Sequence, residues 1–441
     1  MDFLLNGRPA NAGGCAPQTT LLDFLRARGL TGAKEGCAEG ECGACTVVMV
    51  RPRGAASAYV PVNSCLVLLP MVAGHEVYTV EALTADGHLA DCQREIAERG
   101  GSQCGYCTPG FVMSLFAEQY RLGREGSCEP HSMAGNLCRC TGYRPLRDAA
   151  LAIGAPAPDD AFRRRLAQPA PELGPIECEG FARPGTLAKC FRLIMEHPGA
   201  RLIAGGTDLA VEANLRFRRY PYLISLEAVP ELRIHVETAD TIEIGAGVPL
   251  SEIELPHPVW REWLDLFASP QIRNRATLGG NLATASPIGD GAPLLLALDA
   301  RVRIAGARGE RIVPLDKFFQ GYRRTALEAG EVLVSILLPK PLPSVARFYK
   351  AAKRRMDDIS TVAACFAIHA DGSMRAAYGG VAPTPLRAYE AERVLPASVP
   401  RALEILGRTL KPISDHRGSA GYRLALSQSL LEKFFWERSA A

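Results

Sequence analysis

Eight of the fourteen cysteines fall into two tight groups, and no other feature constrains this chain as strongly. The first group is Cys37, Cys42 and Cys45, spaced C-x4-C-x2-C, with Cys65 twenty residues further on. The second group pairs a C-x2-C with a C-x-C, and its members are Cys104, Cys107, Cys138 and Cys140. Cysteines grouped in this way are typical of metal binding when the protein stays in a reducing compartment.

The N-terminal residues indicate such a compartment. Asp2 stands where a secretory signal has basic residues, and the apolar stretch after it is too short for a signal core. No apolar run approaches the roughly 18 residues that a membrane span needs. We therefore expect a cytoplasmic protein with reduced thiols, in which the grouped cysteines are not disulfides.

The first group has the spacing of a plant-type ferredoxin loop for a [2Fe–2S] cluster. Such a loop aims its sulfurs inward and its N–H groups at the anionic cluster, which requires small residues. The loop supplies Gly36, Ala38, Gly40, Gly43 and Ala44. A zinc site is the alternative, but zinc sites usually combine two C-x2-C-like knuckles. A ferredoxin-type cluster is therefore the interpretation that the spacing favours.

The second group leaves both metals open when it is considered alone. Each cysteine pair leads into a helical stretch, and two helix N-termini favour an anionic cluster. The C-x-C pair is awkward for a zinc knuckle, and the neighbouring ferredoxin loop favours iron–sulfur. We expect most of the remaining cysteines to be buried small hydrophobic residues; they are Cys15, Cys92, Cys128, Cys178, Cys190 and Cys365.

Length and charge bound the other possibilities. A chain of 441 residues predicts two to four domains. The 50 basic and 47 acidic residues are mixed along the chain, and the short runs 163–165 and 216–220 look like solvated faces. We therefore expect no nucleic-acid partner.

Local patterns predict the elements and their boundaries. Asn6-Gly7 predicts a hairpin turn, Thr20 an N-cap for a helix over 21–26, and Thr108-Pro109 the start of a helix with one apolar stripe. Strands are expected over 202–204 and 241–244. The Pro-rich stretch 158–175 reads as an extended linker. The predicted division is 1–78, 79–157, the linker 158–175, 176–340 and 341–441.

Three stretches after the linker carry candidate chemistry. Residues 202–209 run a strand into Gly205-Gly206, which suits a pyrophosphate but is more often an ordinary turn. Residues 271–290 combine glycines, amides and hydroxyls, a composition that suits a phosphorylated, polyhydroxylated cofactor. Residues 348–358 read on their own as a solvated charged face. No G-x-G-x-x-G follows a strand, so this is not a Rossmann fingerprint.

These motifs together resemble a known family. Gln103–Gly110 with Asn136–Tyr143 looks like the second iron–sulfur domain of the molybdenum hydroxylases, and Lys34–Thr46 is similar to their first. The three later stretches resemble the FAD domain of the xanthine dehydrogenases. The resemblance implies a multidomain α+β protein. It comprises a β-grasp plant-type ferredoxin domain, an all-α [2Fe–2S] domain, a two-part α+β FAD-binding domain and a C-terminal α+β subdomain.

The resemblance also implies site residues. The eight grouped cysteines would hold two [2Fe–2S] clusters. FAD would be bound by Ile203, Ala204, Gly205, Gly206, Thr207, Asp208, Leu209, Phe267, Thr277, Gly280, Asn281, Thr284, Asp290, Leu333 and Lys350. Tyr322, Asp357 and Asp358 would lie near the nicotinamide of NAD⁺, although the two acids also fit an ordinary surface pair.

The implied function is electron transfer. The chain leaves no room for a molybdopterin domain, so we expect that domain on a partner chain in an (αβ)₂ heterotetramer. Electrons from xanthine or hypoxanthine oxidation, which yields urate, would pass through both clusters and FAD to NAD⁺, with no acid–base residue needed here. The alternatives are a subunit of another hydroxylase acting on an aldehyde or N-heterocycle, a stand-alone NADH:acceptor reductase, or a scaffold holding two zinc ions.

Overall fold

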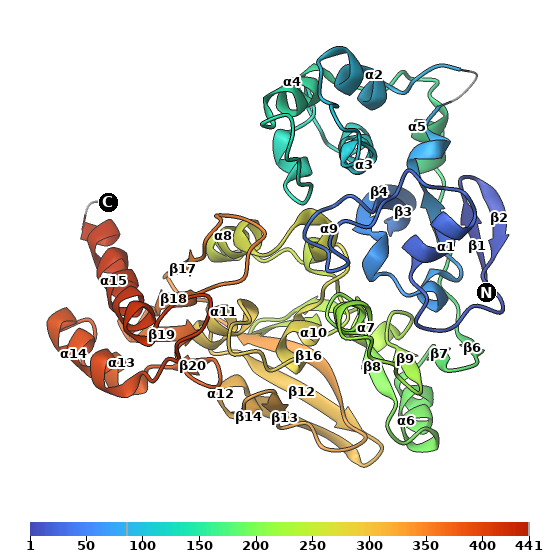
Figure 1. The fold of residues 1–441 in the computed structure, drawn as a ribbon. Helices are drawn as coiled ribbons and strands as arrows, with labels where there is room; N and C mark the ends of the chain where they lie inside the picture. Colours follow the sequence, from blue (N-terminus) through green and yellow to red (C-terminus); the bar gives the residue numbers. More distant parts are fainter. Residues whose placement is uncertain (85–86, 440–441) are drawn as a thin grey trace. The chain divides into compact units, whose positions relative to one another are not determined.

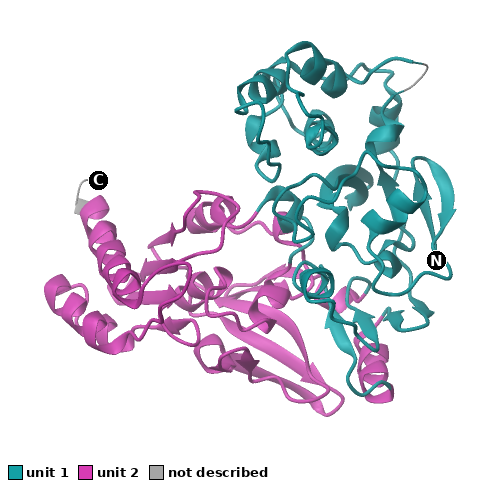
Figure 2. Ribbon diagram, viewed as in Figure 1, with its two compact units in different colours: residues 1–185, 197–228, 269–276 teal, residues 186–196, 229–268, 277–441 magenta. Residues whose placement is uncertain are grey.

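The computed structural model describes residues 1–84 and 87–439 (Figure 1). The chain divides into two compact units, which Figure 2 distinguishes by colour. Unit 1 comprises residues 1–185, 197–228 and 269–276, and unit 2 comprises residues 186–196, 229–268 and 277–441.

Unit 1 opens with a five-stranded mixed sheet in the order β2-β1-β5-β3-β4. Asn6 and Gly7 both adopt positive φ and connect β1 to the antiparallel β2, as the sequence predicts. β1 then pairs in parallel with β5, which gives the β-grasp arrangement. The strands are β1 (Asp2–Leu5), β2 (Arg8–Asn11), β3 (Thr46–Arg53), β4 (Ala56–Asn63) and β5 (Glu76–Tyr78).

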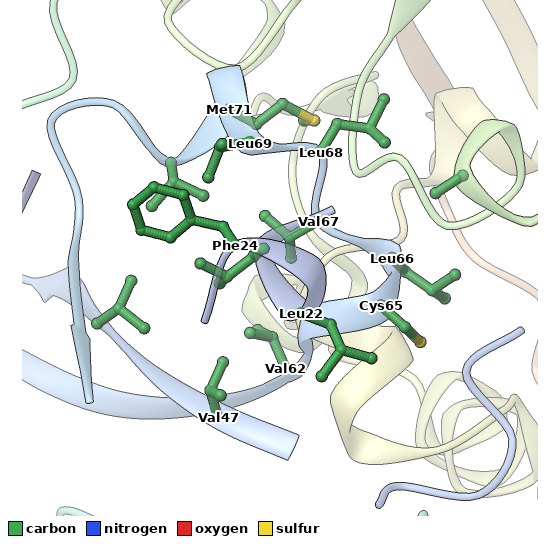
Figure 3. Packing of buried hydrophobic residues seen from close by; sticks show 14 of the residues in the cluster. Leu22, Phe24, Val47, Val62, Cys65, Leu66, Val67, Leu68, Leu69 and Met71 are labelled. Carbon is green, nitrogen blue, oxygen red and sulfur yellow. The ribbon is translucent and has the colours of Figure 1, made fainter. Parts of the chain in front are cut away.

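Helix α1 (Leu21–Ala27) packs against this sheet. The predicted cap is confirmed: Thr20 Oγ1 accepts from Asp23 N–H at 3.1 Å, and the Asp23 carboxylate accepts from Thr20 N–H. The apolar face of the helix enters the core shown in Figure 3, where Cys65 lies beside Leu66 in the buried cluster. Cys65 belongs to the short 3₁₀ helix η1 (Ser64–Leu66), which directly follows β4. This core therefore fixes the remote fourth cysteine of the first group.

The second segment of unit 1 is helical, with α2 (Asp91–Glu98), α3 (Thr108–Gln119) and α4 (Arg144–Ala152). The N-cap of α3 is Cys107, one residue before the predicted Thr108, whose hydroxyl instead donates to Ser102 Oγ. The sequence predicts one apolar stripe on α3, which underestimates how much of this helix is buried. Residues 110–119 of α3 are all buried, because this helix packs against β3 as well as against helical neighbours.

The predicted linker contains a short helix, α5 (Ala161–Leu166). Arg165 on this helix is not the solvated cation that its basic run suggested. Its guanidinium binds both carboxylate oxygens of the buried Glu76, with Nη2···Oε2 at 2.6 Å. Arg163 and Arg164 are exposed, as predicted. The linker is therefore attached to the ferredoxin-like sheet and is not extended throughout.

The rest of unit 1 is a small sheet in the order β6-β7-β9-β8 with two helices. The predicted strand near residue 202 is β8. The elements are β6 (Ile176–Cys178), β7 (Phe181–Arg183), β8 (Arg201–Ile203), β9 (Leu223–Ser225), α7 (Leu209–Leu215) and α9 (Pro270–Arg273).

Unit 2 contains two larger sheets and the hairpin β14-β15. The first sheet has the antiparallel order β10-β11-β16-β12-β13, and β11 confirms the strand predicted near residue 241. The second runs β17-β18-β19-β20. The strands are β10 (His235–Glu237), β11 (Thr241–Gly245), β12 (Arg301–Gly306), β13 (Gly309–Pro314), β14 (Phe319–Gly321), β15 (Arg324–Thr325), β16 (Val332–Pro339), β17 (Val345–Ala351), β18 (Val362–Ile368), β19 (Met374–Gly379) and β20 (Leu386–Arg387).

The helices of unit 2 include α11, buried along its whole length, and α15, which packs against β18. They are α6 (Leu187–Glu196), α8 (Pro258–Leu266), α10 (Leu278–Ala283), α11 (Gly291–Ala297), α12 (Leu315–Phe318), α13 (Tyr389–Glu392), α14 (Val399–Thr409) and α15 (Ala420–Ser439). Within the described part of the chain, no helix combines the length and apolar character needed to cross a bilayer.

Candidate iron–sulfur and flavin sites

The backbone of the first cysteine loop adopts several conformations that favour small residues. Gly40 and Gly43 adopt φ of +85° and +65°, which L side chains rarely tolerate. Ala38 also has positive φ, at +58°. A Cβ added to Gly36 would lie 2.8 Å from Cys42 Sγ. The loop therefore needs its small residues to place the sulfurs close together.

The four sulfurs of the first group lie in two pairs. Cys45 Sγ is 3.4 Å from Cys65 Sγ, and Cys37 shares a hydrogen bond with Cys42. The bond with Cys42 lowers the pKa of Cys37 to about 5, and the bond with Cys65 lowers the pKa of the buried Cys45. The pKa values of Cys42 and Cys65 are raised, first by these same bonds and then by burial.

The second group is also arranged in two pairs, Cys104 with Cys140 and Cys107 with Cys138. Burial and then the bond to Cys138 raise the pKa of Cys107 to about 12. The Cys104 thiol has a lowered pKa, chiefly because it accepts from the backbone N–H of Tyr106. Cys104 and Cys140 are exposed, so one edge of this group faces solvent in the isolated chain.

Two pairs are what a two-iron cluster requires, because each iron takes two thiolates and the bridging sulfides complete its coordination. The paired donor sets therefore fit [2Fe–2S] clusters.

The two cysteine loops contact each other backbone to backbone. The N–H of Leu137, next to Cys138, donates to the carbonyl of Cys42 at 2.9 Å. A Cβ on Gly43 would lie 2.2 Å from the carbonyl oxygen of Gly135, and a Cβ on Gly110 would lie 2.2 Å from that of Gly43. No sequence pattern indicates this junction, because the glycines that permit it are far apart along the chain.

In unit 1, Gly205 and Gly206 form a close-packed turn at the end of β8. A Cβ on Gly205 would lie 1.8 Å from the carbonyl oxygen of Arg275, and Gly206 has φ of +81°. Arg275 Nε donates to the Gly205 carbonyl at 3.2 Å, and its Nη1 binds Glu227 at 2.6 Å. Packing against Arg275 thus explains Gly205 in this structure. Ile203 is buried, Ala204 lies before the turn, and Thr207, Asp208 and Leu209 lead into α7.

In unit 2, the second predicted stretch builds two consecutive helix starts. Thr277 caps α10, since its hydroxyl accepts from Gly280 N–H at 2.9 Å. Asn281 Oδ1 accepts from Gly291 N–H at 3.2 Å, and the Thr284 hydroxyl donates to the Asn281 carbonyl. These residues lie in one turn-rich segment before α11, part of which is helical, and their role in binding a cofactor stays a prediction.

Asp290 and Lys350 form a buried ion pair in unit 2. Lys350 Nζ lies 2.8 Å from Asp290 Oδ2, and the side chains are 3% and 8% exposed. Asp290 also accepts from the Ser360 hydroxyl, and Lys350 donates to the Leu266 carbonyl. The solvated-face interpretation of residues 348–358 is therefore wrong for Lys350, which lies on β17. The sequence could not show the ion pair, because sixty residues separate its members.

The other predicted residues of unit 2 lie on several different elements. Phe267 follows α8, with its ring 5.0 Å from that of Trp263, and Leu333 is buried on β16. Tyr322, 62% exposed, lies between β14 and β15. Asp357 has a positive φ, and Asp358 accepts from the N–H groups of Arg354 and Ile359. These bonds account for the lowered pKa of Asp358, which burial opposes.

Outside the two groups, Cys92, Cys128, Cys190 and Cys365 are buried, as expected, whereas Cys15 and Cys178 are half-buried.

Four family models match successive segments of the chain. A 2Fe-2S iron-sulfur cluster binding domain matches residues 3–69, and a second [2Fe-2S] binding domain matches residues 79–151. The FAD binding domain in molybdopterin dehydrogenase matches residues 176–341, and the CO dehydrogenase flavoprotein C-terminal domain matches residues 347–438. With the paired cysteines, these matches define an iron–sulfur flavoprotein. The predicted boundaries at 78, 157, 175 and 340 stay predictions.

Similar sequences and structures agree. The chain is 35% identical to a xanthine dehydrogenase of Drosophila pseudoobscura pseudoobscura over 98% of its own length and 39% of that protein's. It is 34% identical to xanthine dehydrogenase 1 of Arabidopsis thaliana over 94% of the chain and 38% of that protein. It thus spans about two fifths of the length of these relatives.

Two solved structures of shorter chains align with this chain over almost their whole length. A chain of carbon monoxide dehydrogenase from Hydrogenophaga pseudoflava is 31% identical with a TM-score of 0.55, covering 59% of this chain and 96% of that one. A chain of quinoline 2-oxidoreductase from Pseudomonas putida 86 is 29% identical with a TM-score of 0.54, covering 58% and 95%. The chain belongs to the iron–sulfur and FAD-binding proteins of the molybdenum hydroxylase family. It contains two [2Fe–2S] binding domains and an FAD-binding domain.

Proposed function

We propose that this chain is the electron-transfer subunit of a xanthine dehydrogenase. It would receive electrons from a molybdenum centre on a partner chain that oxidises hypoxanthine or xanthine, and would deliver them to NAD⁺. The observation that carries the proposal is the pair of cysteine groups, each arranged for two iron atoms and joined by the Leu137–Cys42 hydrogen bond. A chain that only bound metal for stability would not need two such groups in contact.

The cluster ligands follow from the pairing. Cys37, Cys42, Cys45 and Cys65 would hold one cluster, and Cys104, Cys107, Cys138 and Cys140 the other. Because Cys104 and Cys140 are the exposed members, the second cluster would be the one approached by the partner. The clusters and FAD supply the redox chemistry when bound, and the protein supplies their binding and orientation.

The flavin residues of unit 2 have a consistent physical role in this proposal. The Asp290–Lys350 pair fixes the end of the turn-rich segment from Thr277 to Asp290, so backbone and side-chain donors there are held for a polar cofactor. Within unit 1, the stretch from Ile203 to Leu209 would offer N–H groups to a pyrophosphate. Gly205 and Gly206 would serve this role in addition to their close packing.

Purification of the chain from its native host tests the proposal. We expect iron, acid-labile sulfide and FAD on this chain, and molybdenum on a co-purifying partner. The complex should reduce NAD⁺ with xanthine, and less well with aldehydes or other N-heterocycles. A chain that is isolated alone as an active NADH:dye reductase would instead support the stand-alone alternative. Faster turnover of an aldehyde or another N-heterocycle would assign the module to a different hydroxylase.

Tyr322 provides a test of the NAD⁺ step. The exposed Tyr322 side chain offers an aromatic surface against which a nicotinamide ring can stack. We expect Tyr322→Ala to lower the rate of NAD⁺ reduction about tenfold, corresponding to a loss of about 1.4 kcal/mol, while the reduction of an artificial dye stays unchanged. Tyr422→Ala, which removes another exposed tyrosine of unit 2, is the control. Equal losses with both acceptors would remove Tyr322 from the nicotinamide site.

A further inference from the structure

A buried hydrogen-bond network lies at the junction of the two cysteine loops and includes one residue from a distant part of the chain. Asn136, two residues before Cys138, donates through Nδ2 to the carbonyl of Gly43 at 3.0 Å. Ser114, on the helix that follows Cys107, donates to Asn136 Oδ1 at 2.6 Å. The network therefore links the loop of the first group to both halves of the second.

Gln271 on α9 completes this network. Its Nε2 donates to Ser114 Oγ at 3.1 Å and to Asn136 Oδ1 at 3.0 Å. Gln271, Ser114 and Asn136 are almost completely buried. A Cβ on Gly135 would lie 2.0 Å from Gln271 Oε1, so the carboxamide is pressed against the loop that leads to Cys138.

The segment that carries Gln271 also holds the first group. Ile272 packs on the ferredoxin-like loop, where a Cβ on Gly40 would lie 2.8 Å from its Cδ1. Asn274 Nδ2 donates to the carbonyl of Pro61 at 2.8 Å, near the strand end that leads to Cys65. Residues 271–274 thus contact both cysteine-bearing regions of unit 1 simultaneously.

The network leaves part of the Gln271 amide without a bond. Within the described residues, Gln271 Oε1 and the nearby Ser269 Oγ are buried without a hydrogen-bond partner. A buried acceptor of this kind is unfavourable for folding, because it has lost its water. An apolar residue of similar length would avoid that cost, so stability alone gives little reason for a glutamine here.

We propose that Gln271 is a positioning residue for electron transfer, whose carboxamide fixes the separation of the two iron–sulfur clusters. The inference rests on the proposed function, since it requires both cysteine groups to hold clusters. Electron transfer between centres falls steeply with distance, so a rigid joint between the loops matters more than the stability that the joint contributes. Gln271 acts through Asn136, which bonds to the Gly43 carbonyl between Cys42 and Cys45.

The test is the magnetic interaction between the two reduced clusters in the full-length protein. This interaction weakens with the cube of their separation and is seen as broadening or splitting in low-temperature electron paramagnetic resonance spectra. In Gln271→Met, we expect the interaction to change while the iron and sulfide contents and the g-values of each cluster stay as in the wild type. Gln168→Met, at an exposed glutamine of unit 1, should leave the interaction unchanged.

A purely structural role gives a different result. In that case Gln271→Met shifts the melting temperature but leaves the interaction between the clusters unchanged, and this outcome overturns the proposal. If Gln271→Met fails to bind its clusters, Ser114→Ala decides, because it removes one hydroxyl of the network. A changed interaction in Ser114→Ala supports the proposal, and an unchanged one overturns it. A wild-type protein lacking either cluster would instead refute the proposed function itself.

Discussion

The backbone N–H of Leu137 donates a 2.9 Å hydrogen bond to the carbonyl of Cys42. This bond links the two cysteine groups. Cys42 is itself a proposed cluster ligand, and Leu137 directly precedes Cys138, a proposed ligand of the other cluster. The bond can form only because Gly43, Gly110 and Gly135 allow the backbones to approach each other. The contact depends on the tertiary structure. The loop contact, the buried Cys65, the Asp290–Lys350 ion pair and the buried His75 each lead to a testable prediction.

The first prediction concerns the close approach of the two loops. Gly110→Ala introduces a Cβ that would lie 2.2 Å from the Gly43 carbonyl oxygen, so the loops must separate. We expect a loss of roughly 1–3 kcal/mol in stability, as for other overpacked sites, and altered spectra of both clusters. Gly154→Ala, where the added Cβ meets no described atom within 4 Å, is the control. Thermal unfolding and spectroscopy of both variants provide the measurement, and equal behaviour would contradict the prediction.

The second prediction assigns the ligands. Cys65→Ala should remove the first cluster, because Cys45 loses the sulfur with which it is paired. The iron and acid-labile sulfide bound per chain should fall by about half, with the spectrum of the second cluster retained. Cys190→Ala removes a buried cysteine of unit 2 that belongs to neither group. The Cys190→Ala variant should keep the full iron content. A full iron content in Cys65→Ala would mean that the assigned ligand set is wrong.

The third prediction concerns the buried ion pair of unit 2. Lys350→Met leaves the carboxylate of Asp290 buried without its cation, although the Ser360 hydroxyl still donates to it. Removing one member of a buried pair typically costs roughly 3–5 kcal/mol, and we expect FAD content to fall as well. Lys411→Met, at an exposed lysine, should change neither quantity. Denaturant unfolding and flavin absorbance measure both effects, and normal FAD content in Lys350→Met would contradict the assigned role.

The fourth prediction is a pH dependence of stability. Burial, reinforced by Arg51, Arg275 and Arg183, holds the pKa of His75 well below its usual value of 6.5. Below about pH 6.5 the unfolded chain binds a proton that the folded chain excludes. Stability should therefore be unaffected above this pH and should fall as the pH drops, by up to about 1.4 kcal/mol per unit.

His75→Gln should remove this component, which makes the melting temperature less sensitive to pH between 7.5 and 5.5. His416→Gln, at an exposed histidine, should retain the full dependence of the wild type. If His75→Gln and the wild type lose stability in parallel as the pH falls, another group is responsible for the dependence.

Local chemistry explains which expectations the structure confirms. The Asn6-Gly7 turn and the Thr20 cap each depend on neighbouring residues, so their geometry is decided within a few positions. The same holds for the positive φ angles at Gly40 and Gly43 in the cysteine loop. Expectations that depended on the binding partner of a side chain were wrong in two cases. Arg165 and Lys350 both looked like solvated cations, yet each binds a buried carboxylate far away in the sequence.

By itself, the sequence determined the type of chemistry. The spacing of the eight cysteines indicates metal binding, and the glycines within the first group favour an iron–sulfur loop, because only certain backbone conformations bring several thiolates together. The tertiary structure decided which sulfurs form pairs, how Gln271 and Asn136 join the two loops, and which charges are buried. Residues that are distant in sequence make these contacts, and they leave no periodic pattern, since each is formed only when whole elements pack.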